Sequence, residues 1–288
     1  MMYFILTFFL GSAIGSFVNV LIDRTMKDEN WVSGRSHCDY CRKTLAWYDL
    51  IPIVSFVIYR GKSRCCHSPL SYRYPIVEMM VGLLFVWWLA VGFWFFRLVS
   101  APLTIIQPGF WLMSGIILAI LTVADLFYGV VLLNIVWIGS LLVALYRLVL
   151  WYYQAYNPRD LVVSIVVGAI FYAGFWALYK MTKGRGMAEG DMYVAMYMGI
   201  LLGWPKGLVA LLASFVLGAV IGILLIVSGV KTRKDNVPFV PFMTSGIVIA
   251  LLFGDQIIGF LGELKFQSGV RYFRVRAWRR CPRDQRRF

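Results

Sequence analysis

Residues 208–230 read LVALLASFVLGAVIGILLIVSGV and contain no charged side chain. A helix needs about 20 apolar residues to cross the hydrocarbon core of a bilayer, so this run predicts a membrane-spanning helix. A shorter apolar run covers 192–202, and we expect its helix to begin before Met192. The sequence therefore predicts an all-α fold, a polytopic integral membrane helical bundle of about eight spans. The other apolar runs cover 2–22, 76–96, 110–127, 130–151, 161–179 and 237–261.

The overall composition points to the same class of protein. The 288 residues are 60% hydrophobic and 15% charged, whereas a soluble domain is about 45–50% apolar and about 25% charged. These values exclude a disordered chain, a fibrous protein and an ordinary water-soluble fold. Residues 1–10 are apolar and lack a basic segment, so we interpret them as part of a retained helix and not as a cleaved signal peptide.

The distribution of Lys and Arg predicts the orientation of the chain in the membrane. They number 28 against 14 Asp and Glu, which gives a net charge of +14, and nine of them lie between residues 23 and 73. Basic loops are typical of the cytoplasmic side, so we expect a cytoplasmic, Cys-containing loop there. Such an excess also favours membrane lipid as a partner, and no nucleic acid is expected.

Four regions follow from these patterns: a first transmembrane helix (1–22), the cytoplasmic loop (23–75), a transmembrane core (76–262) and a basic tail (263–288). The tail carries nine Lys and Arg, although eight spans would place it outside. Either the tail tolerates that position or the last apolar run does not cross the membrane. We interpret the tail as a solvated appendage that can contact lipid headgroups.

Two carboxylates from distant parts of the chain are expected at the same membrane depth. Asp125 lies near the cytoplasmic end of the third predicted span. Asp191 follows a basic cytoplasmic loop at the start of the sixth. Ionisable groups within membrane spans are costly and indicate function. Two carboxyl groups that share a site do not both ionise easily, so one can act as a general base and the other as a general acid.

Other interpretations of these aspartates remain open. Gly186, Ala188 and Gly190 precede Asp191, and we predict that they support the site, because a Gly-rich turn lets the backbone come close to an extended peptide substrate. In the alternative interpretation, the aspartate of this turn simply caps a helix N-terminus. A proton- or ion-coupled transporter also uses membrane carboxylates, although it would place them near the bilayer midplane. A catalytically silent assembly factor is a third alternative, and it would retain its function when either aspartate is substituted.

The cytoplasmic loop contains four closely spaced cysteines, which are typical of metal binding or redox chemistry in a reducing compartment. Cys38 and Cys41 form a C-x-x-C pair, which supplies half of a tetrahedral zinc site. Cys66 would be the third ligand, with Cys65 or His67 as the fourth. A zinc knuckle would explain how this short loop folds without an apolar core of its own.

Six motifs in order resemble the type IV prepilin peptidases, the membrane aspartyl proteases of pilus and type II secretion systems. They lie within residues 11–246, in which Asp125 and Asp191 occupy the positions of the family's two catalytic aspartates. The segments that carry the resemblance are 11–24, 38–52, 69–78, the region of Asp125, 186–191 and 237–242.

The resemblance implies a specific activity in the bacterial cytoplasmic (inner) membrane. The enzyme would cleave the leader of a type IV prepilin or pseudopilin at the cytoplasmic face, without a cofactor for peptide cleavage. Many members then methylate the new N-terminus with S-adenosylmethionine, and Glu78 would belong to that second activity. From physics alone, a Glu78 carboxylate paired with Arg73 at a helix start is at least as good an interpretation.

Three positions depart from the family's pattern. Ala188 and Val240 stand where the family usually has glycine, and Ser63 stands where the first cysteine of the second pair is expected. A methyl group at Ala188 need not abolish cleavage. Metal binding at the loop must recruit Cys65 or His67 in place of Ser63, or the site is lost.

Overall fold

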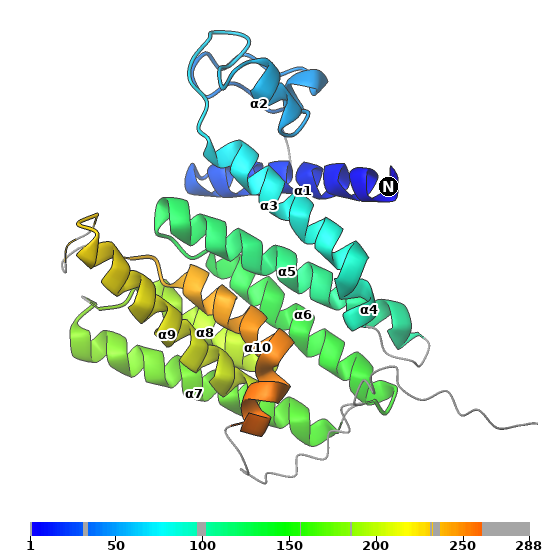
Figure 1. Ribbon diagram of the computed structural model, residues 1–288, viewed down its shortest axis with the longest axis vertical. Coiled ribbons are helices and arrows are strands. Elements are labelled where there is room, and N and C mark those ends of the chain that lie inside the picture. Colours follow the sequence, from blue (N-terminus) through cyan, green and yellow to red (C-terminus); the bar gives the residue numbers. More distant parts are fainter. Residues whose placement is uncertain are drawn as a thin grey trace, which may run out of the picture.

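The computed structural model describes residues 2–30, 34–96, 102–155, 157–184, 186–230, 232 and 237–260. The predicted basic tail at 263–288 lies outside the described residues. Helices dominate the described part (Figure 1). They are α1 (Met2–Met26), η1 (Trp47–Leu50), α2 (Val54–Ile58), α3 (Arg73–Trp87), η2 (Trp88–Gly92), α4 (Phe93–Phe95), α5 (Leu103–Tyr128), α6 (Leu133–Tyr152), α7 (Pro158–Thr182), α8 (Glu189–Leu202), α9 (Lys206–Val227) and α10 (Val240–Phe260).

Seven of the described helical segments are long and apolar enough to cross a membrane: α1, Arg73–Phe95, α5, α6, α7, α9 and α10. The prediction of an all-α, polytopic membrane bundle is therefore confirmed. The eighth predicted span corresponds to α8, which begins at Glu189, before Met192 as expected. Its 14 residues measure about 21 Å along the axis, less than the roughly 30 Å of a hydrocarbon core.

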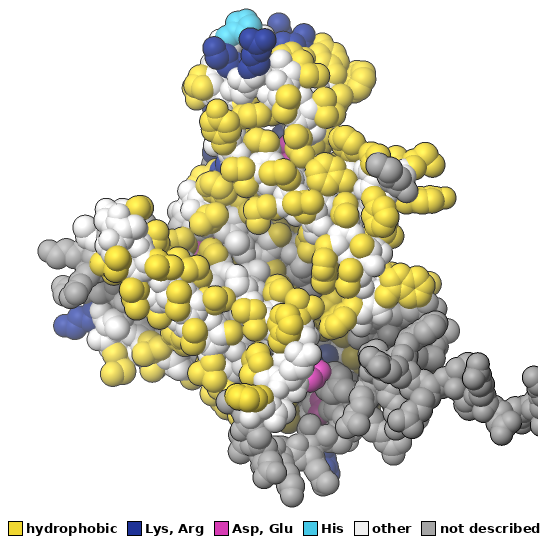
Figure 2. Space-filling model, in the orientation of Figure 1, with side chains coloured by type: hydrophobic (Ala, Val, Ile, Leu, Met, Phe, Trp, Pro, Cys, Tyr) yellow, Lys and Arg dark blue, Asp and Glu magenta, His cyan; other side chains and the backbone are white. Residues whose placement is uncertain are grey.

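Helix α8 compensates for its length by lying inside the bundle. Val194, Ala195, Tyr197 and Met198 are fully buried, and the helix packs against α6, α7, α9 and α10. Figure 2 shows hydrophobic side chains spread over the visible surface of the surrounding helices, as expected for faces that meet lipid. Basic side chains gather instead on the loop between α1 and α3 at one end of the molecule.

Helix α5 begins earlier than the sequence suggested. The predicted span started at residue 110 because Pro108 and Gly109 interrupt the apolar pattern, but the helix extends from Leu103 through Pro108. Proline removes a single backbone donor, and the surrounding packing tolerates that loss here. The carbonyl of Pro108 accepts a hydrogen bond from the indole N–H of Trp88 at 3.0 Å.

Two apolar cores share α5. The larger core joins α5 to α6 through α10, and its α5 members are Phe110, Ile117, Leu118 and Leu121. The smaller core joins α5 to α1 and α3, and its α5 members are Ile120, Val123 and Ala124. The chain therefore has an N-terminal unit, made of α1, α3 and the loop between them, and a C-terminal bundle, with α5 between the two.

Candidate functional site

Asp125 lies one turn from the end of α5. The helix ends at Gly129, whose left-handed backbone (φ 64°) suits glycine and whose N–H donates to the Asp125 carbonyl at 2.9 Å. The carboxylate is buried, at 5% exposure. Its Oδ2 accepts a hydrogen bond from the backbone N–H of Val240, the first residue of α10, at 3.0 Å. The start of α10 therefore stabilises the charge on Asp125.

Asp191 occupies the first turn of α8 and is 3% exposed. Its Oδ2 accepts a hydrogen bond from the backbone N–H of Ala188 at 3.0 Å. The capping role considered for this residue is therefore present. It does not conflict with a second role, because the capping bond uses one of the two carboxylate oxygens. Ala188 itself is exposed and has an extended backbone (φ −75°), a conformation that does not require the glycine usual in the family.

A close contact between two turns brings the aspartates together. A Cβ atom on Gly190 would lie 2.5 Å from Cγ2 of Val131, so only glycine lets the start of α8 approach the α5–α6 turn this closely. The two carboxylates are near enough to repel each other electrostatically. Gly186 lies outside this contact, with its nearest neighbours on Thr182. Its supporting role stays a prediction.

A hydrogen bond that the sequence did not reveal supports the pair. The hydroxyl groups of Thr122 on α5 and Thr244 on α10 lie 2.8 Å apart. Thr122 is one turn before Asp125, and Thr244 is one turn after Val240. The bond therefore fixes the two helices in the register that lets the Val240 N–H reach the carboxylate. A threonine one turn from a membrane aspartate is the only signal in the sequence for this contact.

The loop between α1 and α3 contains the same backbone turn twice, 25 residues apart. Isolated bridges join His37 to Thr44 and Lys62 to Pro69. In the first turn Cys38 donates its N–H to Lys43, and in the second Ser63 donates its N–H to Ser68. Ser63 thus occupies the position that Cys38 has in the first turn, which explains structurally why the second cysteine pair is irregular.

The two turns bring four thiols together. The Sγ atoms of Cys38, Cys41, Cys65 and Cys66 all lie within 4.8 Å of one another. A tetrahedral zinc ion with bonds of about 2.3 Å separates its sulfur ligands by about 3.8 Å, so these residues fit such an ion. Cys65 joins the cluster, whereas His67, the alternative fourth ligand, is outside it and exposed.

Electrostatics in the cluster also favour a cation. Burial opposes ionisation of Cys38, but hydrogen bonds from the Cys41 backbone and from Ser63 lower the pKa of its thiol to about 6. A hydrogen bond with Cys65 raises the pKa of Cys41 to about 12. Ionisation of one thiol therefore disfavours ionisation of its neighbours. A divalent ion would favour the thiolate form of all four cysteines.

Glu78 lies on α3 at 7% exposure and lines a pocket below the cysteine turns. Its Oε2 accepts a hydrogen bond from the backbone N–H of Ile53 at 2.7 Å. The suggested ion pair with Arg73 is wrong, because Arg73 binds the carboxylate of Asp23 at 2.5 Å instead. Asp23 lies in the last turn of α1 and pairs with Arg73 in place of Glu78.

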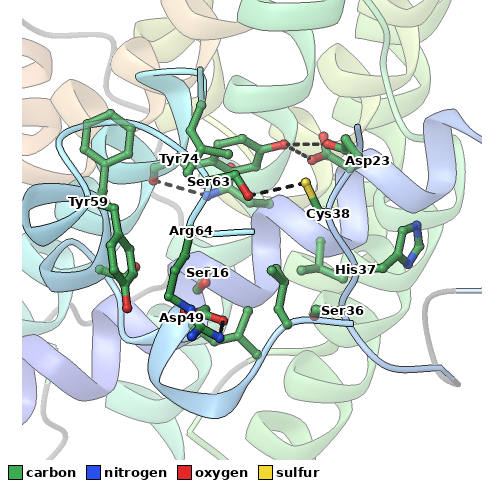
Figure 3. Close-up of a pocket in the computed structure, with 18 of the residues that line it drawn as sticks. Ser16, Asp23, Ser36, His37, Cys38, Asp49, Tyr59, Ser63, Arg64 and Tyr74 are labelled. Atoms are coloured by element: carbon green, nitrogen blue, oxygen red, sulfur yellow. Dashed lines mark hydrogen bonds and ion pairs between the residues drawn. The ribbon is translucent and has the colours of Figure 1, made fainter. Parts of the chain in front are cut away.

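The pocket lies between the C-terminal half of α1, the start of α3 and the cysteine loop (Figure 3). Asp23 and Tyr74 line it, and the Tyr74 hydroxyl donates to Asp23 at 2.9 Å. Tyr128, three residues after Asp125, also donates to Asp23, at 2.5 Å. One hydrogen-bonded group therefore connects the pocket to the end of the helix that carries Asp125.

Comparison with known proteins identifies both parts of the chain. Residues 9–92 match the bacterial peptidase A24 N-terminal domain, and residues 112–223 match the type IV leader peptidase family. The chain is 28% identical over 289 residues to the prepilin leader peptidase/N-methyltransferase of Aeromonas hydrophila, which covers 89% of this chain and 92% of the relative. The Bacillus subtilis protein of the same description is 28% identical, over 88% of this chain and 95% of the relative.

A third relative of the same description, from Myxococcus xanthus, is 30% identical over 79% of this chain. The chain spans 64% of the length of that protein. No solved structure matches the chain.

A polytopic helical bundle with two buried, interacting aspartates at helix ends is a membrane protein with a paired-carboxylate site. Within that class, the chain belongs to the type IV prepilin peptidase family.

Proposed function

We propose that this chain is a membrane aspartyl endopeptidase that removes the leader of type IV prepilin-like proteins, with Asp125 and Asp191 as its catalytic pair. The observation that carries the proposal is the approach of two buried carboxylates from α5 and α8. Membership of the leader peptidase family supports the same reaction. Substrates would be prepilins or pseudopilins with a basic leader ahead of an apolar helix.

The chemistry needs one oxygen on each aspartate that is not already hydrogen-bonded. Oδ2 of Asp125 and Oδ2 of Asp191 accept backbone N–H groups, and no partner for either Oδ1 occurs among the described residues. One carboxylate takes a proton from a water molecule, which attacks the scissile carbonyl carbon. The other carboxyl group donates its proton to the carbonyl oxygen and later to the leaving amine.

The proposed location is the bacterial cytoplasmic (inner) membrane, with the active site at the cytoplasmic face. The basic loop between α1 and α3 supports this orientation, because its Lys and Arg favour the cytoplasmic side (Figure 2). The ends of α5 and α8 that carry Asp125 and Asp191 share that side, since Tyr128 contacts Asp23 at the end of α1. Lipid is the expected partner of the outer helix surfaces, and no nucleic acid is expected.

The second proposed activity is methylation of the new N-terminus with S-adenosylmethionine, and the similarity to prepilin leader peptidase/N-methyltransferases supports it. The N-terminal unit, with Glu78, is the proposed location. Cys38, Cys41, Cys65 and Cys66 would hold a zinc ion that folds the loop, because their sulfur atoms fit its geometry. Peptide cleavage needs no cofactor.

The transporter alternative is not favoured. Asp125 lies one turn from the end of α5, and Asp191 lies in the first turn of α8. A transporter would place these groups in the middle of long spans. The leader peptidase match over 112–223 covers both residues and agrees with a protease.

A cleavage assay in detergent micelles tests the proposed function. A synthetic prepilin N-terminal segment is incubated with the wild type, Asp125→Asn and Asp191→Asn, and product masses are recorded. We expect each substitution to reduce the cleavage rate by about 10³-fold or more. Asp255→Asn is the control, because Asp255 is exposed and pairs with Lys206 away from the site. Cleavage that survives in both variants would contradict the proposed pair.

A further inference from the structure

The pocket between α1, α3 and the cysteine loop contains one acidic side chain without a counter-charge. Five acidic residues line this pocket, and four of them form ion pairs with Lys or Arg. Glu78 is the exception: within the described residues it has no ion pair, and its partners are the Ile53 backbone and the Ser16 side chain. The pairs are Asp23–Arg73, Glu29–Arg42, Asp39–Lys27 and Asp49–Arg64.

A buried carboxylate without a cation is unfavourable. Glu78 is held in place by backbone contact, since a Cβ on Gly15 of α1 would lie 2.8 Å from the Glu78 Cα. It therefore cannot move to solvent without separating α1 from α3. A ligand that brings a positive charge into the pocket would compensate this carboxylate.

A second polar group in the pocket lacks a donor. Asn19 on α1 lines the pocket and is 2% exposed. Its Nδ2 donates to the Tyr74 carbonyl at 3.2 Å, which orients the amide, and its Oδ1 is buried without a hydrogen-bond partner in the described part of the chain. An orphaned acceptor of this kind is unfavourable unless a ligand or water supplies a donor.

These two acceptors define the chemistry of the ligand. A group that satisfies both must be positively charged and must donate hydrogen bonds, which an ammonium group does and a sulfonium does not. Phe56, Tyr59 and Tyr74 line the same pocket, and aromatic rings attract cations.

We propose that Glu78 and Asn19 form an ammonium-binding subsite in the methyl-transfer pocket. This inference rests on the proposed second activity, which supplies two sources of that chemistry: the α-ammonium of S-adenosylmethionine and the new N-terminal ammonium of the cleaved substrate. The hydrogen-bonded group of Asp23, Tyr74 and Tyr128 places this subsite beside the end of α5, which carries Asp125.

Binding measurements on the full chain in detergent distinguish the two sources. The probes are S-adenosylmethionine against 5′-methylthioadenosine, which lacks the amino-acid part, and a synthetic mature peptide against its N-acetylated form. We expect Glu78→Gln to weaken binding of one charged probe by about 10- to 100-fold, while its neutral counterpart changes less than about twofold. The pair of probes that responds identifies the source of the ammonium.

Asn19→Leu should weaken the same charged probe, because it removes the second acceptor without changing the charge. Asp49→Asn is the matched control, since Asp49 lines the same pocket but already pairs with Arg64 at 2.9 Å. An unchanged circular dichroism spectrum and unfolding temperature in Glu78→Gln establish that the chain remains folded. Equal responses of charged and neutral probes to Glu78→Gln would overturn the inference.

A second pair of variants tests the pocket independently of charge. Ser55→Trp fills the pocket from α2, whereas Val57→Trp places the same ring two residues away at a position that is 66% exposed and outside the lining. We expect only Ser55→Trp to abolish binding of the responding probe, and unchanged binding would overturn the assignment.

A wild type that cleaves but neither methylates nor binds either charged probe contradicts the proposed methylation itself. A methylating wild type with unresponsive variants contradicts only the subsite.

Discussion

The cysteine loop and the aspartate pair hold polar groups in different ways. In the loop, Cys38, Cys41, Cys65 and Cys66 form a cluster in which only Cys38 is buried, and ion pairs such as Asp49–Arg64 connect the segments. Around the aspartates, packed apolar helices hold the polar groups instead: nine of the 14 residues of α8 are buried, and each carboxylate accepts one backbone N–H. With the proposed zinc ion bound, the loop would depend on a metal for its fold, whereas the aspartate pair depends on helix packing.

Loss of the proposed metal site should separate these two regions. Cys38→Ser, or removal of metal with a chelator, should unfold the loop and reduce methylation of a pre-cleaved peptide by about 100-fold or more. Leader cleavage should stay within about threefold of wild type, because the aspartates lie outside the loop. Metal content by mass spectrometry and both activities in detergent provide the measurement. Equal loss of both activities would show that the two regions are not independent.

The second cysteine turn offers a matched control for this result. Cys65→Ala should release the metal, and adding Ser63→Cys should restore it, because residue 63 occupies in the second turn the position that Cys38 has in the first. Failure of the double variant to bind metal would contradict the equivalence of the two turns.

A smaller effect is expected at the contact that positions Asp191. Gly190→Ala places a methyl group against Val131 and displaces the start of α8. Misplacement of a reacting group by about 1 Å can reduce a rate by about 100-fold, so we expect cleavage to fall by about 10- to 100-fold. Gly174→Ala on α7 is the control, since its new Cβ would have no neighbour within 4 Å. A wild-type rate in Gly190→Ala would remove this contact from the proposal.

The hydroxyl bond between α5 and α10 should contribute less. Thr122→Val removes the bond to Thr244 and leaves the helix shape intact, so we expect kcat for cleavage to fall about 3- to 10-fold at constant KM. Thr122→Ser retains the hydroxyl group and should restore the wild-type value. A change confined to KM would indicate a role in substrate binding instead of positioning.

No effect is expected at His67. It is exposed and lies outside the thiol cluster, so His67→Ala should change metal content and both activities by less than about twofold. Loss of metal in this variant would mean that the histidine replaces Cys65 as the fourth ligand.

The fold and site were most predictable from the sequence where a residue pattern has few structural explanations. Long apolar runs predicted the membrane bundle, and aspartates at the ends of such runs predicted Asp125 and Asp191 as a pair. The four cysteines predicted the cluster, although the choice between Cys65 and His67 needed the fold. That choice depends on backbone turns, which a spacing pattern does not specify.

Other features could not be predicted because they arise from packing between distant segments. The short length of α8 was visible, but its burial at the centre of the bundle follows from four neighbouring helices. The bond between Thr122 and Thr244 joins residues 122 positions apart. The pocket of Asn19 and Glu78 likewise exists only once α1, α3 and the loop meet.

The position of α5 between two cores has a consequence for the angle at which Asp125 is presented. Successive residues of a helix point about 100° apart. On α5, Leu121 faces one core and Ile120 faces the other, and both are buried. A rotation of the helix about its axis would expose apolar side chains in both cores at once. The direction in which α5 presents the Asp125 side chain is therefore fixed by both cores, before any substrate binds.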